Sequence, residues 1–129
     1  MAVDIWSAGV IAFILLGGYP PFQSDDDNRD ALFAVIKTGK FKFHSQYWKD
    51  ISAGAKEFIK AMLTLGPFER PTAKECLAHA WLNADAAKLG ADLAGTTLPA
   101  LKEFNAKRKL KATMATVKAM RAFQMVGKL

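Results

Sequence analysis

The stretch from Val3 to Leu16 is apolar on nearly every side of a helix, and it constrains the fold more than any other part of the chain. Two glycines follow it, and the Pro20–Pro21 pair prevents the helix from continuing. A helix that has no polar face has to be covered by protein on every side. The sequence therefore predicts a buried helix over residues 3–16, with the other elements packed around it.

The same apolar run excludes two classes of protein. It is shorter than the roughly 20 residues that a membrane span needs. Asp4 stands where a signal peptide carries its basic residues. The one cysteine, Cys76, rules out an intrachain disulfide framework and fits a reducing compartment. We therefore expect no membrane span and a location in the cytoplasm, with the nucleus as the alternative.

Helix signals recur along the rest of residues 1–82. Three aspartates at positions 25–27 precede an amphipathic pattern that continues toward residue 38. Ser52 can cap a further helix that ends before Gly66–Pro67. Thr72 and Glu75 have the spacing of a reciprocal capping box. No segment shows a convincing strand alternation, so the predicted fold class is all-α, with about four helices in this region.

The acidic and histidine residues are not spaced like a metal site. The three aspartates lack the alternating acids, the central glycine and the closing glutamate of an EF-hand loop. His44 lies in an aromatic loop at residues 40–50, without a second ligand at metal spacing. We expect His44 at the surface or in packing, and Cys76 in helix packing. No metal and no cofactor is predicted for this chain.

Positive charge is concentrated at the C-terminal end. Residues 101–129 hold eight lysines and arginines against one acid, Glu103, whereas residues 1–100 hold ten against eleven acids. Residues 83–97 turn to small side chains and are predicted to form a linker, after which Pro99 can open a final helix. A basic segment on a nearly neutral body suggests an acidic partner.

The order of several motifs resembles a known family. The stretch "DIWSAGVIAFILLGGYPPF" (4–22), followed by "ERPTAKECLAHAWL" (69–82), resembles the lower half of the C-terminal lobe of eukaryotic protein kinases. The intervening "FHSQYWKDISAGAKEFIKAML" and the later "FNAKRKLK" are similar to the calcium/calmodulin-dependent branch, most of all to its type I members. The resemblance implies a partial kinase lobe over 1–82, a linker over 83–97 and an autoinhibitory, calmodulin-binding segment over 98–129.

The resemblance also implies structural roles for three residues of the lobe. Asp4 would accept hydrogen bonds from backbone amides of the catalytic loop, Arg70 would pair with the glutamate that closes the activation segment, and Trp6 would belong to the lobe scaffold. Gly66 stands where the family usually has aspartate, and Ala80 where it usually has proline. These departures affect local loop geometry.

Catalysis needs motifs that these 129 residues do not contain. Phosphoryl transfer requires a glycine-rich loop, a lysine for the phosphates, a catalytic aspartate and asparagine, and a metal-holding aspartate. The sequence has no G-x-G-x-x-G, V-A-I-K, H-R-D or D-F-G motif. ATP and Mg²⁺ are thus implied for a complete kinase only, and the chain alone is predicted to be inactive.

The resemblance to a kinase lobe also predicts a low stability of the fold. If Asp4 and Arg70 are buried without their usual partners, each one-sided pair costs about 3 to 5 kcal/mol. Domain stabilities are roughly 5 to 15 kcal/mol. We therefore expect a marginal or partner-dependent fold, unless solvent reaches both groups. A cooperative thermal transition above roughly 50 °C would contradict that expectation.

Calmodulin, an anionic membrane and a nucleic acid are the three candidate partners of the basic helix. The directions of its apolar side chains around the helix axis distinguish them. Met114 and Val117 fall within about 40° of Leu110, whereas Phe123 lies about 140° away. Large apolar side chains on different sides suit a partner that wraps the helix better than a flat membrane. A nucleic acid could use the cations, but no zinc, helix-turn-helix or base-reading pattern supports it.

Calcium-loaded calmodulin is the partner that the pattern favours. It combines acidic rims with methionine-lined pockets for large apolar side chains. The predicted contacts are the apolar Leu110, Met114, Val117 and Phe123, with the basic Lys107, Arg108, Lys109 and Lys111. The alternative is that Leu110, Met114 and Val117 pack on the helical body as a core face. The missing kinase lobe and a protein substrate are the other expected partners.

Two threonines are candidates for phosphorylation. Thr116 lies within the basic helix, where a phosphate would add about −1.5 to −2 charges and oppose an acidic partner. Thr97 corresponds to an activating site of some relatives, but Ala94 replaces the arginine expected three residues before it. Only Thr116 is therefore kept as a conditional hypothesis.

Overall fold

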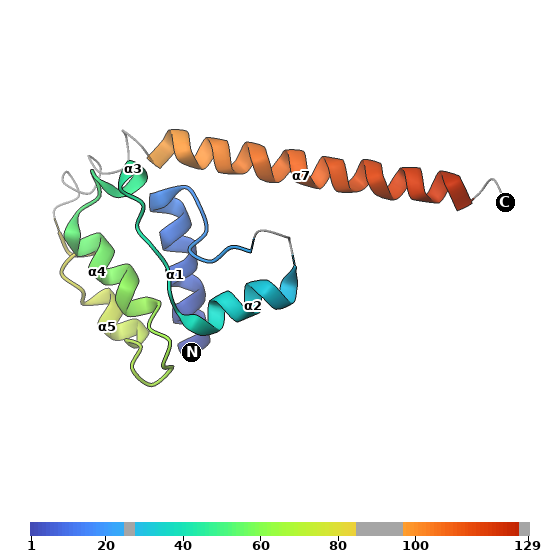
Figure 1. Cartoon of the computed structure of the whole chain (residues 1–129). Coiled ribbons are helices and arrows are strands. Elements are labelled where there is room, and N and C mark those ends of the chain that lie inside the picture. Colours follow the sequence, from blue (N-terminus) through green and yellow to red (C-terminus); the bar gives the residue numbers. More distant parts are fainter. Residues whose placement is uncertain (25–27, 85–96, 127–129) are drawn as a thin grey trace.

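The computed structural model describes residues 1–24, 28–84 and 97–126, and all the regular secondary structure within them is α-helical (Figure 1). The helices are α1 (Ala2–Gly17), α2 (Arg29–Thr38), α3 (Ser45–Trp48), α4 (Ala53–Met62), α5 (Ala73–Leu77) and α7 (Thr97–Val126). The predicted all-α class is confirmed. The three aspartates at 25–27 and most of the predicted linker, residues 85–96, lie outside the described residues.

Helix α1 stands at the centre of the body, in contact with α3, α4 and α7. It ends as its glycines predict, because Gly18 adopts φ +75° and donates its N–H to the carbonyl of Ile14 at 2.8 Å. Gly17 is needed for a different reason. A Cβ at this position would lie 2.7 Å from the Trp48 indole of α3, so the ring packs directly on the helix backbone.

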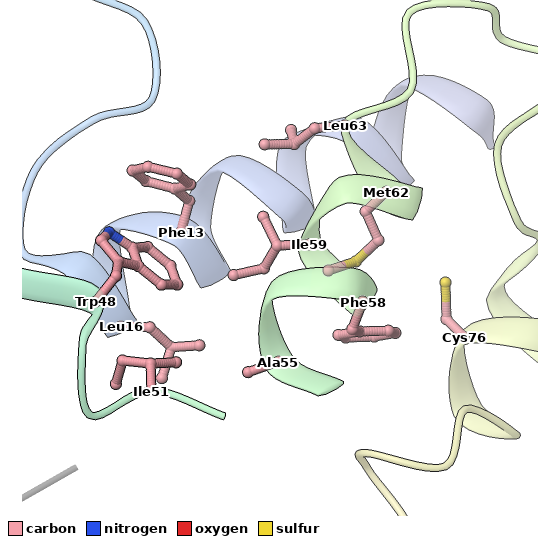
Figure 2. Close-up of a cluster of buried hydrophobic side chains, with 10 residues drawn as sticks. All are labelled: Phe13, Leu16, Trp48, Ile51, Ala55, Phe58, Ile59, Met62, Leu63 and Cys76. Carbon is pink, nitrogen blue, oxygen red and sulfur yellow. The ribbon is translucent and has the colours of Figure 1, made fainter. Parts of the chain in front are cut away.

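The core lies between α1 and α4 (Figure 2). Phe13 and Ile59, one from each helix, are completely buried. The face of α4 that packs into this core carries Ala55, Phe58, Ile59 and Met62. Cys76 of α5 is also buried against this core, as expected. The full cluster consists of Phe13, Leu16, Trp48, Ile51, Ala55, Phe58, Ile59, Met62, Leu63 and Cys76.

An aromatic group ties the 40–50 segment to the end of α1. Phe13 stacks on Phe43 with the ring centroids 5.5 Å apart. The Tyr19 hydroxyl donates to the Lys42 carbonyl at 2.8 Å and accepts the His44 N–H at 3.0 Å. The segment predicted as a loop contains the single turn of α3, which begins after the exposed His44.

The predicted helix caps are present. The Ser52 hydroxyl accepts the N–H of Ala55 at 3.3 Å. The Thr72 hydroxyl accepts the Glu75 N–H at 3.3 Å, while the Glu75 carboxylate accepts the Thr72 N–H at 2.7 Å. Helix α4 ends at Met62, which is earlier than the Gly66–Pro67 pair suggested.

One prediction about α1 is wrong for the described part of the chain. Protein does not surround this helix, because Val3, Ile11 and Leu15 are 71%, 58% and 50% exposed. Their spacing places them within one sector of α1, about 120° wide, away from the buried Phe13. A helix that is apolar all round has no preferred face, so the sequence cannot tell which side its neighbours leave open.

Candidate functional site

Helix α7 has two halves with different surroundings. Its first half (97–109) lies against the end of α1, and its second half (110–126) extends away from the body (Figure 1). The contact is made by small residues. Ala100 is buried, and a Cβ at Gly18 would lie 2.4 Å from the Cβ of Ala100. Any larger side chain at either position would push α7 away from α1.

The side of α7 that faces the body is partly basic. Ala100, Phe104, Lys107 and Lys111 recur at helical spacing and all border one groove. The opposite walls are the segment from Gly18 to Ser24, the start of α2, and Tyr47. The groove has a volume of about 530 Å³. We call it the α7 groove.

The predicted apolar anchors of the second half point to solvent. Leu110 is 62% exposed and Met114 is 54% exposed. The alternative that these two side chains form a core face on the body is therefore wrong in this structure. The side chains of Val117 and Phe123 lie outside the described residues.

Cations surround the exposed anchors. Lys107, Arg108, Lys109 and Lys111 are all exposed. Lys107 pairs with Glu103 at 2.6 Å, and the hydrogen bond and charge of that carboxylate raise the pKa of Lys107. The shift favours the charged form of Lys107.

The two described threonine side chains in the second half of α7 are bonded along the helix. The Thr113 hydroxyl donates to the carbonyl of Lys109 at 2.9 Å. The Thr116 hydroxyl donates to the carbonyl of Ala112 at 3.0 Å. Thr116 is exposed, and its phosphorylation stays a prediction.

Arg70 holds the other end of the body together. Its Nε donates to the carbonyl of Thr64 at 2.7 Å, and its two Nη atoms donate to the carbonyls of Ala2 and Leu65 at 2.8 and 2.9 Å. The guanidinium also lies 4.7 Å from the centroid of the Trp6 ring. Trp6 in turn stacks on Phe22 at 5.5 Å.

These contacts correct the expectation of two unpaired buried charges. Arg70 finds carbonyl acceptors for all three of its nitrogen positions. The Asp4 side chain is 83% exposed and lies 3.1 Å from the amino group of Met1. Neither group is a buried charge without a partner, so the penalty of about 3 to 5 kcal/mol does not apply to either.

The described ranges contain neither a metal-binding cluster nor a membrane-spanning helix. No three histidine, cysteine or acidic side chains among residues 1–24, 28–84 and 97–126 are grouped as metal ligands. None of the described helices combines the length and apolarity that a membrane crossing requires.

The α7 groove is a structural feature that the sequence did not reveal. Phe104 and Lys107 were visible as parts of a basic helix, but Tyr19, Arg29 and Tyr47 come from three other segments. The helical spacing of Ala100, Phe104, Lys107 and Lys111 was the only sequence pattern that could have indicated which face of α7 borders the groove. Leu110, Met114 and Val117 form a more apolar stripe on the same helix, and that stripe was the more prominent pattern.

Comparison with known proteins identifies the family of the lobe. Residues 1–82 match the family model of the protein kinase domain. In the solved twitchin kinase region from C. elegans, a similar structure covers 85% of this chain and 19% of that one, with a TM-score of 0.72 and 29% sequence identity.

Three curated relatives are each 42% identical to this chain. Calcium/calmodulin-dependent protein kinase type II subunit delta from Oryctolagus cuniculus matches over 98% of this chain and 24% of its own length. The kinase cmkA from Emericella nidulans matches over 91% and 27%. Calcium/calmodulin-dependent protein kinase type 1 from Caenorhabditis elegans matches over 97% and 35%.

The chain thus spans about a quarter to a third of the length of these relatives. The family model covers more than half of the chain itself and includes every helix from α1 to α5. The chain therefore belongs to the protein kinase family, and its relatives include calcium/calmodulin-dependent kinases.

Proposed function

We propose that this chain is the C-terminal part of a calcium/calmodulin-dependent serine/threonine protein kinase. The parent reaction is ATP-dependent phosphorylation of protein serine and threonine, with ATP and Mg²⁺ bound by parts of a kinase that this sequence does not contain. Residues 1–82 supply the scaffold of the substrate lobe. Residues 98–129 supply a helix that binds calmodulin and inhibits the kinase when it is docked.

The observation that carries this proposal is the exposure of Leu110 and Met114 beside four exposed cations. A soluble protein leaves large apolar side chains in solvent at a cost of about 1.5 to 3 kcal/mol each relative to burial. Grouped exposure of this kind is typical of a surface that binds a partner. The cations select a partner of negative charge.

Calmodulin fits this combination better than a membrane or a nucleic acid. Its pockets accept the Leu and Met side chains and its acidic rim meets the cations. A membrane-bound helix needs one continuous apolar face, whereas Arg121 falls near the direction of Leu110 on a helical projection. Nucleic acid would use the lysines and leave the exposed apolar side chains without a role.

The rival proposal is a free-standing regulatory module that binds calmodulin without any kinase activity in its parent protein. Both proposals share the calmodulin-binding helix, so binding experiments do not separate them. The coding sequence upstream of Met1 separates them, because D-F-G and H-R-D motifs there would make the parent an enzyme.

Isothermal titration calorimetry with calmodulin tests the shared helix. We expect saturable binding in calcium and none in a chelator. The double variant Leu110→Asp with Phe123→Asp should weaken binding by at least about tenfold, since two buried apolar contacts become charges.

A matched control comes from the same helix. Leu98 is 53% exposed in the first turn of α7 and is not among the predicted calmodulin contacts, which begin at Lys107. Leu98→Asp introduces the same change at a helix N-terminus, where an acid is tolerated. It should leave calmodulin binding unchanged. An equal loss of affinity in both variants would show that Leu110 and Phe123 are not specific calmodulin contacts.

A further inference from the structure

The α7 groove is built from four separate parts of the chain. They are the first half of α7 together with Lys111, the segment after α1, the start of α2, and Tyr47 of α3. Its volume of about 530 Å³ falls within the range of roughly 300 to 1,000 Å³ typical of ligand pockets.

Aromatic rings form part of the walls of the groove. Tyr19, Phe22, Tyr47 and Phe104 all line it. Phe22 is buried beneath the surface, whereas the other three rings are only partly buried. Rings that are half-exposed around a concave surface favour an apolar or aromatic group as occupant.

The rim of the groove carries unbalanced positive charge among the described residues. Four cations line it, against the one carboxylate of Glu103, which is already paired with Lys107. Within residues 1–24, 28–84 and 97–126, Arg29 and Arg108 have no ion-pair or hydrogen-bond partner. These two guanidiniums come from different walls, α2 and α7.

We propose that the α7 groove binds a short acidic peptide segment in which an aromatic side chain lies between carboxylates. The aromatic side chain packs inside the groove against Tyr19, Tyr47 and Phe104. A carboxylate on one side meets Arg29 and a carboxylate on the other meets Arg108, each by a charge-assisted, bidentate hydrogen bond.

The alternation of acid, aromatic and acid follows from the position of the two arginines on different walls of the groove. A ligand with one carboxylate would satisfy only one of them, whereas a peptide places acids on both sides of an aromatic residue. The proposal does not depend on calmodulin, because Arg29 lies outside the proposed calmodulin segment.

Fluorescence anisotropy with a labelled peptide, Glu-Asp-Phe-Asp-Glu, tests the proposal on the full chain without calmodulin. We expect saturable binding that weakens as salt is added. The peptide in which glycine replaces the phenylalanine should bind at least about tenfold more weakly, since it has no group for the aromatic walls. Equal binding of the two peptides would overturn the proposal.

Two pairs of variants locate the site. Arg29→Glu should weaken binding by at least about tenfold, whereas Lys37→Glu, the same charge reversal at the other end of α2 and outside the groove, should not. On α7, Arg108→Gln should weaken binding and its exposed neighbour Lys109→Gln should not.

Circular dichroism confirms that each variant keeps its helices. If the members of a pair lose affinity equally, attraction is a property of the net charge and the groove proposal is wrong. The absence of saturable binding to the folded wild-type chain would also overturn it. Neither result affects the calmodulin proposal.

Discussion

At the scale of single residues, Arg70 makes three side-chain hydrogen bonds to backbone carbonyls of two separate segments. It connects the first turn of α1 to the loop after α4 through three carbonyls. Hydrogen bonds from a charged donor contribute about 1.5 to 3 kcal/mol each, although one side chain does not add them in full.

We expect Arg70→Ala to lower the free energy of unfolding by about 2 to 4 kcal/mol, because three carbonyls lose their donor and Trp6 loses a packed cation. Asp4→Asn should change it by less than about 0.5 kcal/mol, since Asp4 is exposed. Urea unfolding followed by circular dichroism measures both. Equal effects of the two substitutions would contradict the roles assigned here.

Gly18 is the residue that decides how closely α7 approaches α1. We expect Gly18→Ala to destabilise the chain by about 1 to 3 kcal/mol, because the residue has φ +75° and the added methyl group would overlap Ala100. Thermal unfolding is the measurement.

Gly54→Ala is the matched control for this substitution. Gly54 lies inside α4, and an added Cβ there would meet its nearest atom at 3.5 Å, an ordinary contact. Because Gly54 is the second residue of α4, alanine there should stabilise the chain by no more than about 0.5 to 1 kcal/mol, the gain in a helix interior. The two glycine substitutions should therefore shift the midpoint in opposite directions, and a shift of the same sign would refute this account of Gly18.

The residues that the sequence placed correctly are those whose roles depend on neighbours in the chain. Ser52, Thr72 and Glu75 form their caps because capping requires a spacing of three residues and little else. Arg70 depends on Ala2, which is 68 positions away, so no local pattern could reveal its carbonyl partners.

At the scale of elements, the start of α5 is stabilised by a carboxylate. The N–H and hydroxyl of Thr72 donate to Glu75, and these bonds hold the pKa of the Glu75 carboxyl below its usual value of 4.5. The folded state therefore binds the proton more weakly than the unfolded state. The stabilising contribution is present above pH 4.5 and is lost as the pH falls through the lower, folded pKa.

The substitution Glu75→Gln tests whether stability falls with pH in this direction. Glutamine can also cap the helix but does not titrate. Between about pH 5 and pH 3, the wild-type chain should lose more stability than the variant. Thermal midpoints measured over this range give the comparison, and parallel pH profiles would show that Glu75 does not contribute.

The elements themselves were largely predictable, because long helices have periodic apolar faces and clear end signals. α4 and α5 began at the caps that the sequence indicated. The one-turn helix α3 was missed, since four residues are too few to show a period. The end of α4 was placed too late because the Gly66–Pro67 pair marks the following loop.

At the scale of the whole molecule, α1 has a covered side and an open side. Its buried side meets α3 and α4, while Val3, Ile11 and Leu15 stay exposed. The chain also spans only about a quarter to a third of its curated relatives. The open apolar side is where we would place the remainder of a kinase lobe, in agreement with the proposal that this is the C-terminal part of one.

The position of α7 follows the same distinction between local and long-range information. The sequence located the basic helix, but not which of its faces would contact the body. Phe104 and Lys107 line the α7 groove, whereas Leu110 and Met114 are exposed to solvent. That choice depends on the close approach of Ala100 and Gly18, which are 82 residues apart in the sequence.

Amide hydrogen exchange of the full chain, with calmodulin in calcium or in a chelator, tests the central claim most directly. The account predicts slower exchange across residues 107–123 in calcium alone, with unchanged exchange in α4. Unchanged exchange across 107–123 in calcium would show that α7 is not a calmodulin-binding helix, provided that calmodulin is present far above the dissociation constants of its ordinary targets.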